Sequence, residues 1–465
     1  MAWDKVIDVG ELMENQKLGR FQLLVAALGF LIFFIDGLDN SAVPVSAPAI
    51  LNALHVPRSA LGITFGAGSV GSLVGSVLFG YIADHWGRRR AILASVLAYA
   101  TATFCSAFAP SLTVLTALRF VTGLGVAGVV PITIALLTET APKAYRAQFV
   151  MVTLIGIAAG NGAAGLVGAT LLPGLGFPAV FLTCGGFGLV VGIALVFVLP
   201  ESLRYLAVAA PEALELRRIV GRIAPDLDFA GARFTLAQAP RPAVALKELF
   251  AGERRVSTPL LWTGYFAEAI TFYTLISWMV VFLTSAGLDE RTAALAFSYA
   301  SAGGICAVLA MSRILDRAGP PALVASALAG LFFVLAMGLP DLPHVALVAL
   351  AVLAVAFCTG THNSLNGTVG LYYPTALRGK GVGYATGMGR LGLSIGPPAT
   401  GFLLAIQLPL SEVLASVAAP YVVVAVACGM LGRVYQRRLK TGANIEESVT
   451  ASRPSQPAAP ALDPR

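Results

Sequence analysis

Two carboxylates three residues apart lie near the end of the first long apolar run of the chain. Asp36 and Asp39 follow a stretch that begins at Phe21, so on a helix they share one face, roughly 22 to 27 Å along its axis. An ionised group at that depth of a bilayer costs at least roughly 2.5 to 3.5 kcal/mol, so we expect the pair to face a wet cavity and to bind protons or ions. The alternative is a helix-end pair near the outer interface.

A third acidic residue occupies the matching position in an internal repeat. Glu268 follows Asp36 by 232 residues, and the same offset relates Gly128 to Gly360. This regularity indicates a duplicated chain, and two similar halves are typical of transporters that bind substrate between them near the bilayer midplane. Glu268 is predicted to be a second proton-coupling residue. The alternative is a hydrogen-bonded structural glutamate whose acidity is inherited from the duplication.

Two arginines are predicted inside membrane spans. Arg390 lies between Gly389 and Gly392, where small neighbours let a ligand approach, and its planar guanidinium suits a carboxylate. It is predicted to bind the substrate, unless Glu268 or an aspartate satisfies it internally. The same choice applies to Arg119, which we assign to proton coupling.

Polar and aromatic residues of the second half are candidates for a binding cavity. Such side chains stack a flat ring and hydrogen-bond its substituents, although each one alone is more often a packing residue, an interfacial anchor or hydrogen-bonded scaffold. The predicted substrate-binding set, besides Arg390, is Tyr273, Trp278, His362 and Asn363.

Charged residues near the predicted inner helix ends suggest a gate. Asp84 with Arg88, Glu139 with Arg146, and Asp316 with Arg378 are expected to form ion pairs that break when the gate opens. Exposed pairs are weak singly, so a network is required; the alternative is that the basic residues only fix topology. The gating set also includes two glycines of the same loop, Gly80 and Gly87.

Composition places the chain in a bilayer. With 57% hydrophobic and 12% charged residues, a water-soluble fold would lack polar surface. The five cysteines are odd in number and lie in apolar runs without metal-ligand spacing, so no metal site is predicted. Reading twelve spans leaves Arg58 and Arg291 as the basic residues of the outer loops, which places both termini in the cytoplasm.

The predicted fold is an all-α membrane protein with 12 transmembrane helices in two pseudo-symmetric six-helix bundles. The expected spans are 21–48, 60–82, 91–109, 112–138, 147–171, 177–199, 256–285, 290–313, 320–340, 344–373, 381–406 and 411–435. The domains are a cytoplasmic segment at 1–20, the first bundle at 21–199, a polar linker at 200–255 with a short surface helix around 212–223, the second bundle at 256–436, and a disordered cytoplasmic tail at 437–465.

These motifs resemble those of the major facilitator superfamily, over nearly all of residues 20–435. The loop signature is the stretch from Gly80 to Arg90, repeated faintly at Asp316, where Ser312 and Pro320 depart from the pattern. Within the superfamily the chain is most similar to the aromatic acid:proton symporters, through the Asp36-Gly37-Leu38-Asp39 motif and three further stretches: 200–206, 373–378 and 389–397.

The resemblance implies a symporter that imports an aromatic or heteroaromatic carboxylic acid with protons by alternating access. It implies that Asp36 and Asp39 serve proton coupling or substrate recognition and that Arg390 meets the carboxylate. The glycine-proline signature of drug exporters is absent from residues 147–172, which favours import. Expected partners are a small organic anion, protons and the lipid bilayer, with no nucleic acid, and the protein is expected to act as a monomer in the cell inner membrane.

Other classes of function remain as alternatives. A carrier for another organic anion or a sugar-like solute would share the fold, and so would a membrane sensor that binds without transporting. An enzyme is not expected, because no Walker loop, zinc-protease motif or nucleophile elbow occurs in the sequence. No cofactor is expected, and the proton gradient would supply the energy.

Overall fold

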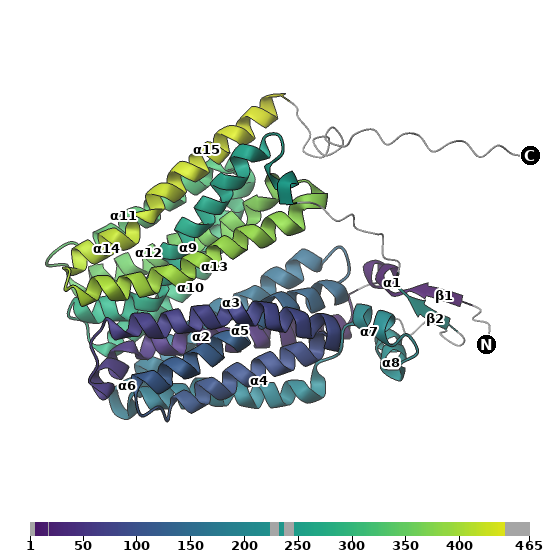
Figure 1. The fold of residues 1–465 in the computed structure, drawn as a ribbon, viewed down its shortest axis with the longest axis horizontal. Helices are drawn as coiled ribbons and strands as arrows, with labels where there is room; N and C mark the ends of the chain where they lie inside the picture. The colour runs from purple at the N-terminus through teal and green to yellow at the C-terminus, as the bar shows by residue number, and fades with distance from the viewer. Residues whose placement is uncertain (1–4, 17, 224–231, 237–245, 442–465) are drawn as a thin grey trace, which may run out of the picture.

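Long helices dominate the computed structural model of the chain, which describes residues 5–16, 18–223, 232–236 and 246–441. They form two groups that lie one above the other in Figure 1. The first group contains α2 (Arg20–Leu54), α3 (Ala60–Trp86), α4 (Arg88–Ser106), α5 (Leu112–Thr140) and α6 (Arg146–Val198).

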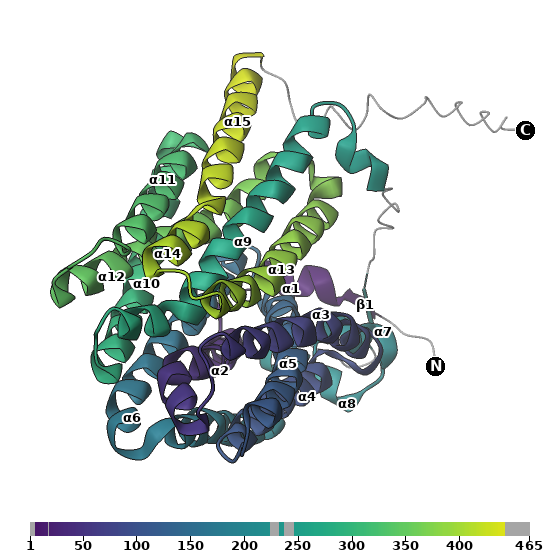
Figure 2. The same ribbon diagram turned by 60° about the vertical axis from the view of Figure 1, so that its left-hand side comes forward.

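The second group consists of the helices of the second half. It contains α9 (Arg254–Ser285), α10 (Glu290–Ala318), α11 (Pro321–Ala336), α12 (His344–Thr368), the 3-10 turn η2 (Val369–Leu371), α13 (Thr375–Ala405), α14 (Leu410–Ala418) and α15 (Pro420–Thr441). The two groups meet along α6, α10, α3 and α13 (Figure 2).

Short elements gather beside the first group at the end where the chain begins (Figure 1). They are β1 (Lys5–Asp8), α1 (Val9–Asn15), α7 (Leu203–Ala209), α8 (Leu214–Ile223) and β2 (Ala232–Thr235), while η1 (Leu246–Phe250) precedes α9. β1 pairs with β2 in parallel, a two-stranded sheet that the sequence did not predict. The predicted linker helix is confirmed as α8, which buries Leu216, Ile219, Val220 and Ile223.

Eight helices of the described chain are long and apolar enough to cross a membrane. The predicted spans 147–171 and 177–199 run together as α6, within which Gly176 has non-helical angles (φ 69°) between Pro173 and Pro178. The last predicted span is divided into α14 and α15 at Ala419. Proline lacks the backbone N–H that a helix requires, and glycine tolerates positive φ, so Pro173, Gly176 and Pro178 explain the break within α6. Pro420, the first residue of α15, explains the break after α14.

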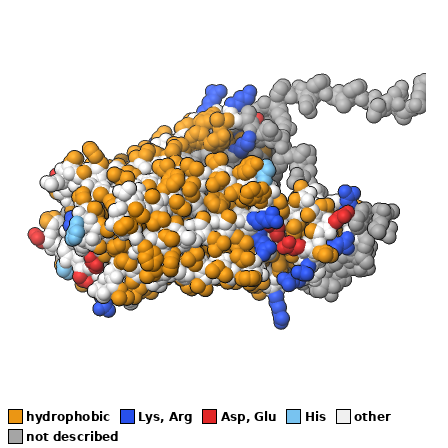
Figure 3. All heavy atoms as spheres, turned by 60° about the horizontal axis from the view of Figure 1, so that its bottom comes forward, with side chains coloured by type: hydrophobic (Ala, Val, Ile, Leu, Met, Phe, Trp, Pro, Cys, Tyr) orange, Lys and Arg blue, Asp and Glu red, His pale blue; other side chains and the backbone are white. Residues whose placement is uncertain are grey.

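Apolar side chains cover the sides of the helix bundle, and most charged side chains lie towards one end (Figure 3). We call this the terminal end, because β1, which begins the described chain, and the end of α15 lie on this side (Figure 1). We call the opposite end the far end. The α3–α4 turn and the starts of α2, α6 and α9 are at the terminal end. A belt of this kind matches the apolar core of a bilayer.

Glycines allow helices α2 and α6 to approach at backbone distance. A Cβ added at Gly37 would overlap the carbonyl oxygen of Ile157, and one at Gly160 would overlap that of Phe34. Ser41 also donates a hydrogen bond of 2.9 Å to Asn161 Oδ1. Small residues at such crossings let apolar helices pack without a hydrophobic driving force, and here they fix the segment of α2 that carries Asp36 and Asp39.

The two groups touch mainly towards the far end. Asn52 of α2 donates to Glu290 of α10 at 3.2 Å, and Ser298 of α10 donates to the carbonyl of Gly162 in α6 at 2.8 Å. The backbones of α3 and α13 also meet, since a Cβ on Gly401 would lie only 2.8 Å from the Cα of Gly62. The hydrogen bonds that join described residues of the two groups therefore lie in the far half of the bundle.

Candidate functional site

Asp39 is held inside the first group by hydroxyls and one guanidinium. It is 4% exposed, it accepts a hydrogen bond from the hydroxyl of Thr103, and its Oδ1 lies 3.6 Å from Arg119. Arg119 also donates to Thr103 at 2.9 Å and to Ser106 at 3.0 Å. A buried charge needs a partner with hydrogen bonds to its remaining atoms, and this cluster from α2, α4 and α5 provides one for Asp39.

Asp36 lies one turn earlier on α2 without such a partner. It is 4% exposed, and its Oδ1 is buried with no hydrogen bond to any residue that the structure describes. The hydroxyl of Tyr99 on α4 is buried and unpartnered in the same way, and the two groups lie within electrostatic reach of each other. The two carboxyls predicted as a pair therefore have different surroundings.

A cavity of about 110 Å³ lies between the two groups beside Asp39 and Arg119. Its first-group wall is rich in hydroxyls, and Ser277, Leu393 and Pro397 close it from the second group. The remaining lining residues include Asn40, Thr64, Phe65, Ser69, Ser72 and Thr122. A concave site with a few polar groups is typical of small-molecule binding, and both halves of the chain contribute to this one.

Glu268 and His362 form a second polar cluster, inside the second group. Nδ1 of His362 on α12 lies 2.8 Å from Oε2 of Glu268 on α9. The glutamate side chain is 1% exposed and that of the histidine 23%. The imidazole stacks on Phe272, with ring centroids 4.5 Å apart and planes at 10°. The structure thus gives Glu268 a histidine partner, a pairing that the sequence did not predict.

The other predicted ring-binding residues are divided by the structure. Tyr273 is half-buried and packs edge-on against His362 at 5.9 Å. Asn363 is exposed and donates to the carbonyl of Thr359. Trp278 does not line the cavity, because it is fully buried. Its indole N–H donates a hydrogen bond of 3.0 Å to the carbonyl of Pro397, and its ring packs on Phe65 with centroids 5.3 Å apart. Its large ring is needed to fill the contact between the groups.

Arg390 is half-buried on α13 and has no ion pair with any residue in the described ranges. Two of its possible internal partners are engaged elsewhere, because Glu268 pairs with His362 and Asp39 lies beside Arg119, while Asp36 forms no ion pair with a described residue. Gly392, two residues later, lets α13 approach the carbonyl of Phe266 on α9. Arg390 remains a predicted anion receptor.

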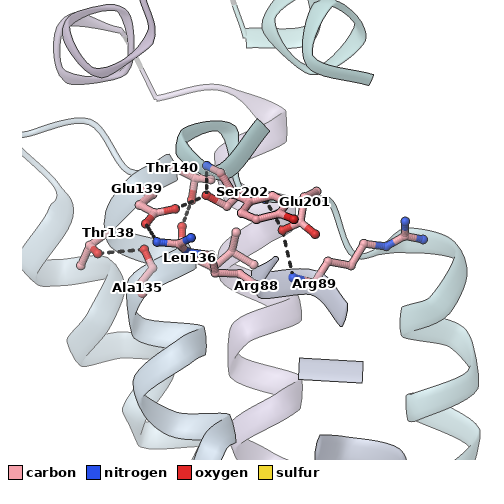
Figure 4. A network of polar contacts seen from close by, with 10 residues as sticks. Arg88, Arg89, Ala135, Leu136, Thr138, Glu139, Thr140, Glu201 and Ser202 are labelled. Carbon is pink, nitrogen blue, oxygen red and sulfur yellow. Dashed lines mark hydrogen bonds and ion pairs between the residues drawn. The ribbon is translucent and has the colours of Figure 1, made fainter. Parts of the chain in front are cut away.

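A network at the terminal end joins three loops of the first group (Figure 4). Arg88 at the start of α4 lies 3.3 Å from Glu139 of α5, and Glu139 accepts a hydrogen bond from the hydroxyl of Ser202. Glu201 accepts from the backbone N–H of Arg89 at 3.0 Å and of Ser202 at 2.8 Å. Burial raises the pKa of the Glu201 carboxyl, and these N–H donors oppose that shift.

Two predicted ion pairs of the gating set are not formed in this structure. Asp84 is exposed and forms no ion pair among described residues, because Gly87, with φ 96°, ends α3 and turns the chain so that Arg88 reaches Glu139 instead. Arg146 pairs with Glu14 of α1 at 3.5 Å, a partner from the short elements that helix spacing does not reveal.

Two further residues of the gating set, Gly80 and Arg378, lie at open positions. A Cβ added at Gly80 would meet no atom within 4 Å, and Arg378 is exposed. The side chain of Asp316 lies outside the described residues, so its predicted pair with Arg378 stays a prediction.

Several residues of these clusters were not predicted from the sequence. Thr103 and Ser106 are three residues apart inside the predicted span 91–109, which places them on one helix face, and a search for paired hydroxyls in apolar spans would have found them. Glu14 has no comparable signal. Across residues 5–441, leaving aside the gaps, no group of three His, Cys, Asp or Glu side chains could hold a metal ion.

Comparisons with known proteins agree with this architecture. The family described as Major Facilitator Superfamily matches residues 29–397. The chain is 30% identical to the 4-hydroxybenzoate transporter PcaK of Pseudomonas aeruginosa, covering 92% of this chain and 96% of that protein. It is also 30% identical to the gallate transporter of Pseudomonas putida, covering 88% and 91% of the two chains.

Solved structures show the same fold. A bacterial homologue of the human lysosomal transporter Spinster, in an inward-facing and unoccupied conformation, superimposes with a TM-score of 0.67 at 17% identity over 91% of this chain and 99% of that one. A D-xylose–proton symporter gives a TM-score of 0.68 at 16% identity over 88% and 97%.

Proposed function

This chain belongs to the major facilitator superfamily and, within it, to the family of aromatic acid transporters, and we propose that it imports an aromatic or heteroaromatic carboxylate together with protons. Twelve spans in two bundles, 21–199 and 256–436, would carry the substrate by alternating access across the bacterial inner membrane. In this proposal both termini are cytoplasmic, since most Lys and Arg residues lie at the terminal end.

The unpartnered carboxyl of Asp36 is the observation that carries the proposal of proton coupling. A buried carboxylate without a partner is costly, whereas a carboxyl that gains a proton loses that charge. Asp39, one turn away, has Arg119 and Thr103 as partners. Asp36 is therefore the proposed proton carrier, and Asp39 with Arg119 the proposed pair that changes as the cavity opens.

The proposal of an aromatic acid as substrate comes from the relatives and from the unpaired cation. PcaK and the gallate transporter are named for aromatic acids. Arg390, without an ion pair in the described part of the chain, would bind the carboxylate by two parallel hydrogen bonds. Phenylalanine, tyrosine and histidine rings near Glu268 would offer the flat faces that an aromatic ring prefers.

The position of the contacts between the groups supports an inward-facing state. With the terminal end cytoplasmic, the hydrogen bonds of Asn52 and Ser298 close the outer side. The network of Arg88, Glu139 and Ser202 joins loops of the first group only. It would therefore move with that group as a rigid unit when the inner side closes.

Uptake by purified protein in liposomes tests the proposal. Labelled 4-hydroxybenzoate, gallate, benzoate and nicotinate would be offered with an inward proton gradient, which an ionophore then collapses. We expect accumulation of one acid that ends when the gradient is removed. Binding of an acid without uptake would support a sensor, and gradient-dependent uptake of a sugar would contradict the proposed substrate class.

A further inference from the structure

The Glu268–His362 pair has the geometry of a group that presents one ring nitrogen to a ligand. With Oε2 of Glu268 at 2.8 Å, Nδ1 carries the proton, since that nitrogen must donate to the carboxylate. Phe272 covers one face of the imidazole. The side chain of Glu268 is 1% exposed, whereas that of His362 is 23% exposed. The accessible part of the imidazole is therefore the edge that points away from Glu268, and this edge contains Nε2.

No Lys or Arg in the described part of the chain forms an ion pair with Glu268. Titratable groups within electrostatic reach of Glu268 include Tyr265 and Tyr273 of α9, Cys358 and His362 of α12, and Tyr421 and Cys428 of α15. Arg390 of α13 and Asp36 of α2 lie within electrostatic reach of Tyr273. Oε1 of Glu268 is buried and has no hydrogen bond to a described residue. Histidine is thus the one ion-pair partner that the described structure gives this carboxylate.

A hydrogen-bonded chain fixes the histidine from its backbone side. The hydroxyl of Tyr265 donates to Oδ1 of Asn366 at 3.0 Å, and Nδ2 of Asn366 donates to the carbonyl of His362 at 3.1 Å. Together with the stacking on Phe272, these contacts restrict the rotation of the ring. Groups held in place in this way bind a ligand with a smaller loss of conformational entropy.

We propose that protonated His362, positioned by Glu268, is a proton-dependent receptor for the carboxylate of the substrate in the second half. The inference deepens the proposed function and rests on it. His362 would act together with the permanent cation Arg390, and Glu268 is the positioning residue that keeps Nε2 directed away from itself. This site would bind the substrate together with one proton, and Asp36 would carry a further proton that accumulation also requires.

The charges balance at each step. With neutral imidazole the pair carries one negative charge, which repels an anion. When the lone pair of Nε2 takes a proton from the outer side, the imidazolium and the carboxylate sum to zero, and the new N–H donates a charge-assisted hydrogen bond to the substrate carboxylate. Once the cavity opens inward and the anion leaves, Nε2 returns its proton to the cytoplasm. One proton and one monoanion then cross together at this site.

Substrate affinity as a function of pH tests this inference. Binding and uptake of 4-hydroxybenzoate would be measured between about pH 5 and pH 8, the range in which imidazole titrates, for wild type, His362→Gln and Glu268→Gln. We expect His362→Gln to weaken affinity about tenfold or more at low pH, as for a lost charge-assisted hydrogen bond. The affinity of the His362→Gln variant should not change with pH over this range.

The glutamate variant should behave differently from the histidine variant. Without the carboxylate at Nδ1, the imidazolium is less stable, so Glu268→Gln should bind poorly near neutral pH and recover affinity at the acidic end. Glu268→Asp should restore part of the wild-type pH profile. His344→Gln is the matched control, since His344 is exposed at the start of the same helix, and its affinity should not change.

The first two outcomes separate failure of the receptor inference from failure of the proposed transport function. If His362→Gln keeps wild-type affinity and pH profile, or if both variants lower only the melting temperature, the receptor inference is wrong. If wild type shows pH-dependent binding that needs His362 but never accumulates substrate, the receptor stands and the proposed transport function fails. If wild type binds none of the aromatic acids, the proposed substrate class fails and the receptor inference fails with it.

Discussion

The guanidinium of Arg119 lies 3.6 Å from the carboxylate of Asp39, and both side chains are almost completely buried. Arg119 also lies over the ring of Phe181 at 5.4 Å and donates to two hydroxyls of α4. The pair links three helices of the first group at the edge of the cavity between the groups. Movement of any of these helices would change the electrostatic surroundings of Asp36.

Removal of the charge of Asp39 should destabilise the protein. In Asp39→Asn, Arg119 loses its carboxylate and becomes an uncompensated buried cation, which costs about 3 to 5 kcal/mol. We expect a large drop in the melting temperature of the purified protein, together with loss of uptake. An unchanged melting temperature would mean that Arg119 has another anionic partner.

Asp36→Asn should separate stability from coupling. Asparagine imitates the protonated carboxyl, so the melting temperature should stay equal to that of wild type or rise. In liposomes, proton-driven accumulation should be lost, while exchange of labelled for unlabelled substrate should continue. Normal accumulation by this variant would remove Asp36 from the coupling mechanism.

Arg390→Lys should weaken substrate binding without a loss of charge. Lysine keeps the cation but not the planar pair of donors, so we expect affinity for the transported acid to fall about tenfold. The matched control is Arg291→Lys, at an exposed position at the start of α10. Equal affinities in the two variants would show that Arg390 does not contact the carboxylate.

Two glycines of one loop signature should respond in opposite ways to alanine. Gly87 has φ 96°, and a Cβ there would overlap the carboxylate of Glu201. Gly87→Ala should therefore cost about 1 to 3 kcal/mol, through backbone strain and disruption of that carboxylate. Gly80 lies within α3 with open space around a Cβ, so Gly80→Ala should be neutral or slightly stabilising. Thermal unfolding of both variants distinguishes these outcomes, and similar melting temperatures would contradict the prediction.

Glu201 should make stability depend on pH. Because burial raises the pKa of its carboxyl above the ordinary 4.5, the folded state holds this proton more tightly than the unfolded state. The free energy of unfolding should then fall as pH rises from about the ordinary value to the raised one. Glu201→Gln keeps an oxygen acceptor for the N–H groups of Arg89 and Ser202 but cannot ionise, so its melting temperature should rise relative to wild type as pH increases through that window. A constant difference would exclude Glu201 as the source.

Much of the candidate site was visible in the sequence as a set of residue types, but not as a set of contacts. Asp36, Asp39, Glu268, Arg119 and Arg390 are charged residues in apolar runs, which local hydropathy identifies directly. Their partners come from other helices. Glu268, which was the alternative internal partner for Arg390, pairs with His362 instead. The ion pairs at the terminal end also depend on contacts between elements, since Arg88 reaches Glu139 and Arg146 reaches Glu14.

The sequence by itself determined the apolar helices, their order, the duplication of the chain and the setting in a membrane, because hydropathy and periodicity are properties of neighbouring residues and a bilayer allows few backbone conformations. Only the tertiary structure decided which charges meet, that Trp278 fills a contact between the groups and that β1 pairs with β2. These outcomes depend on the rotation of each helix about its axis and on backbone approach at glycines such as Gly37, which are set by packing across the whole bundle.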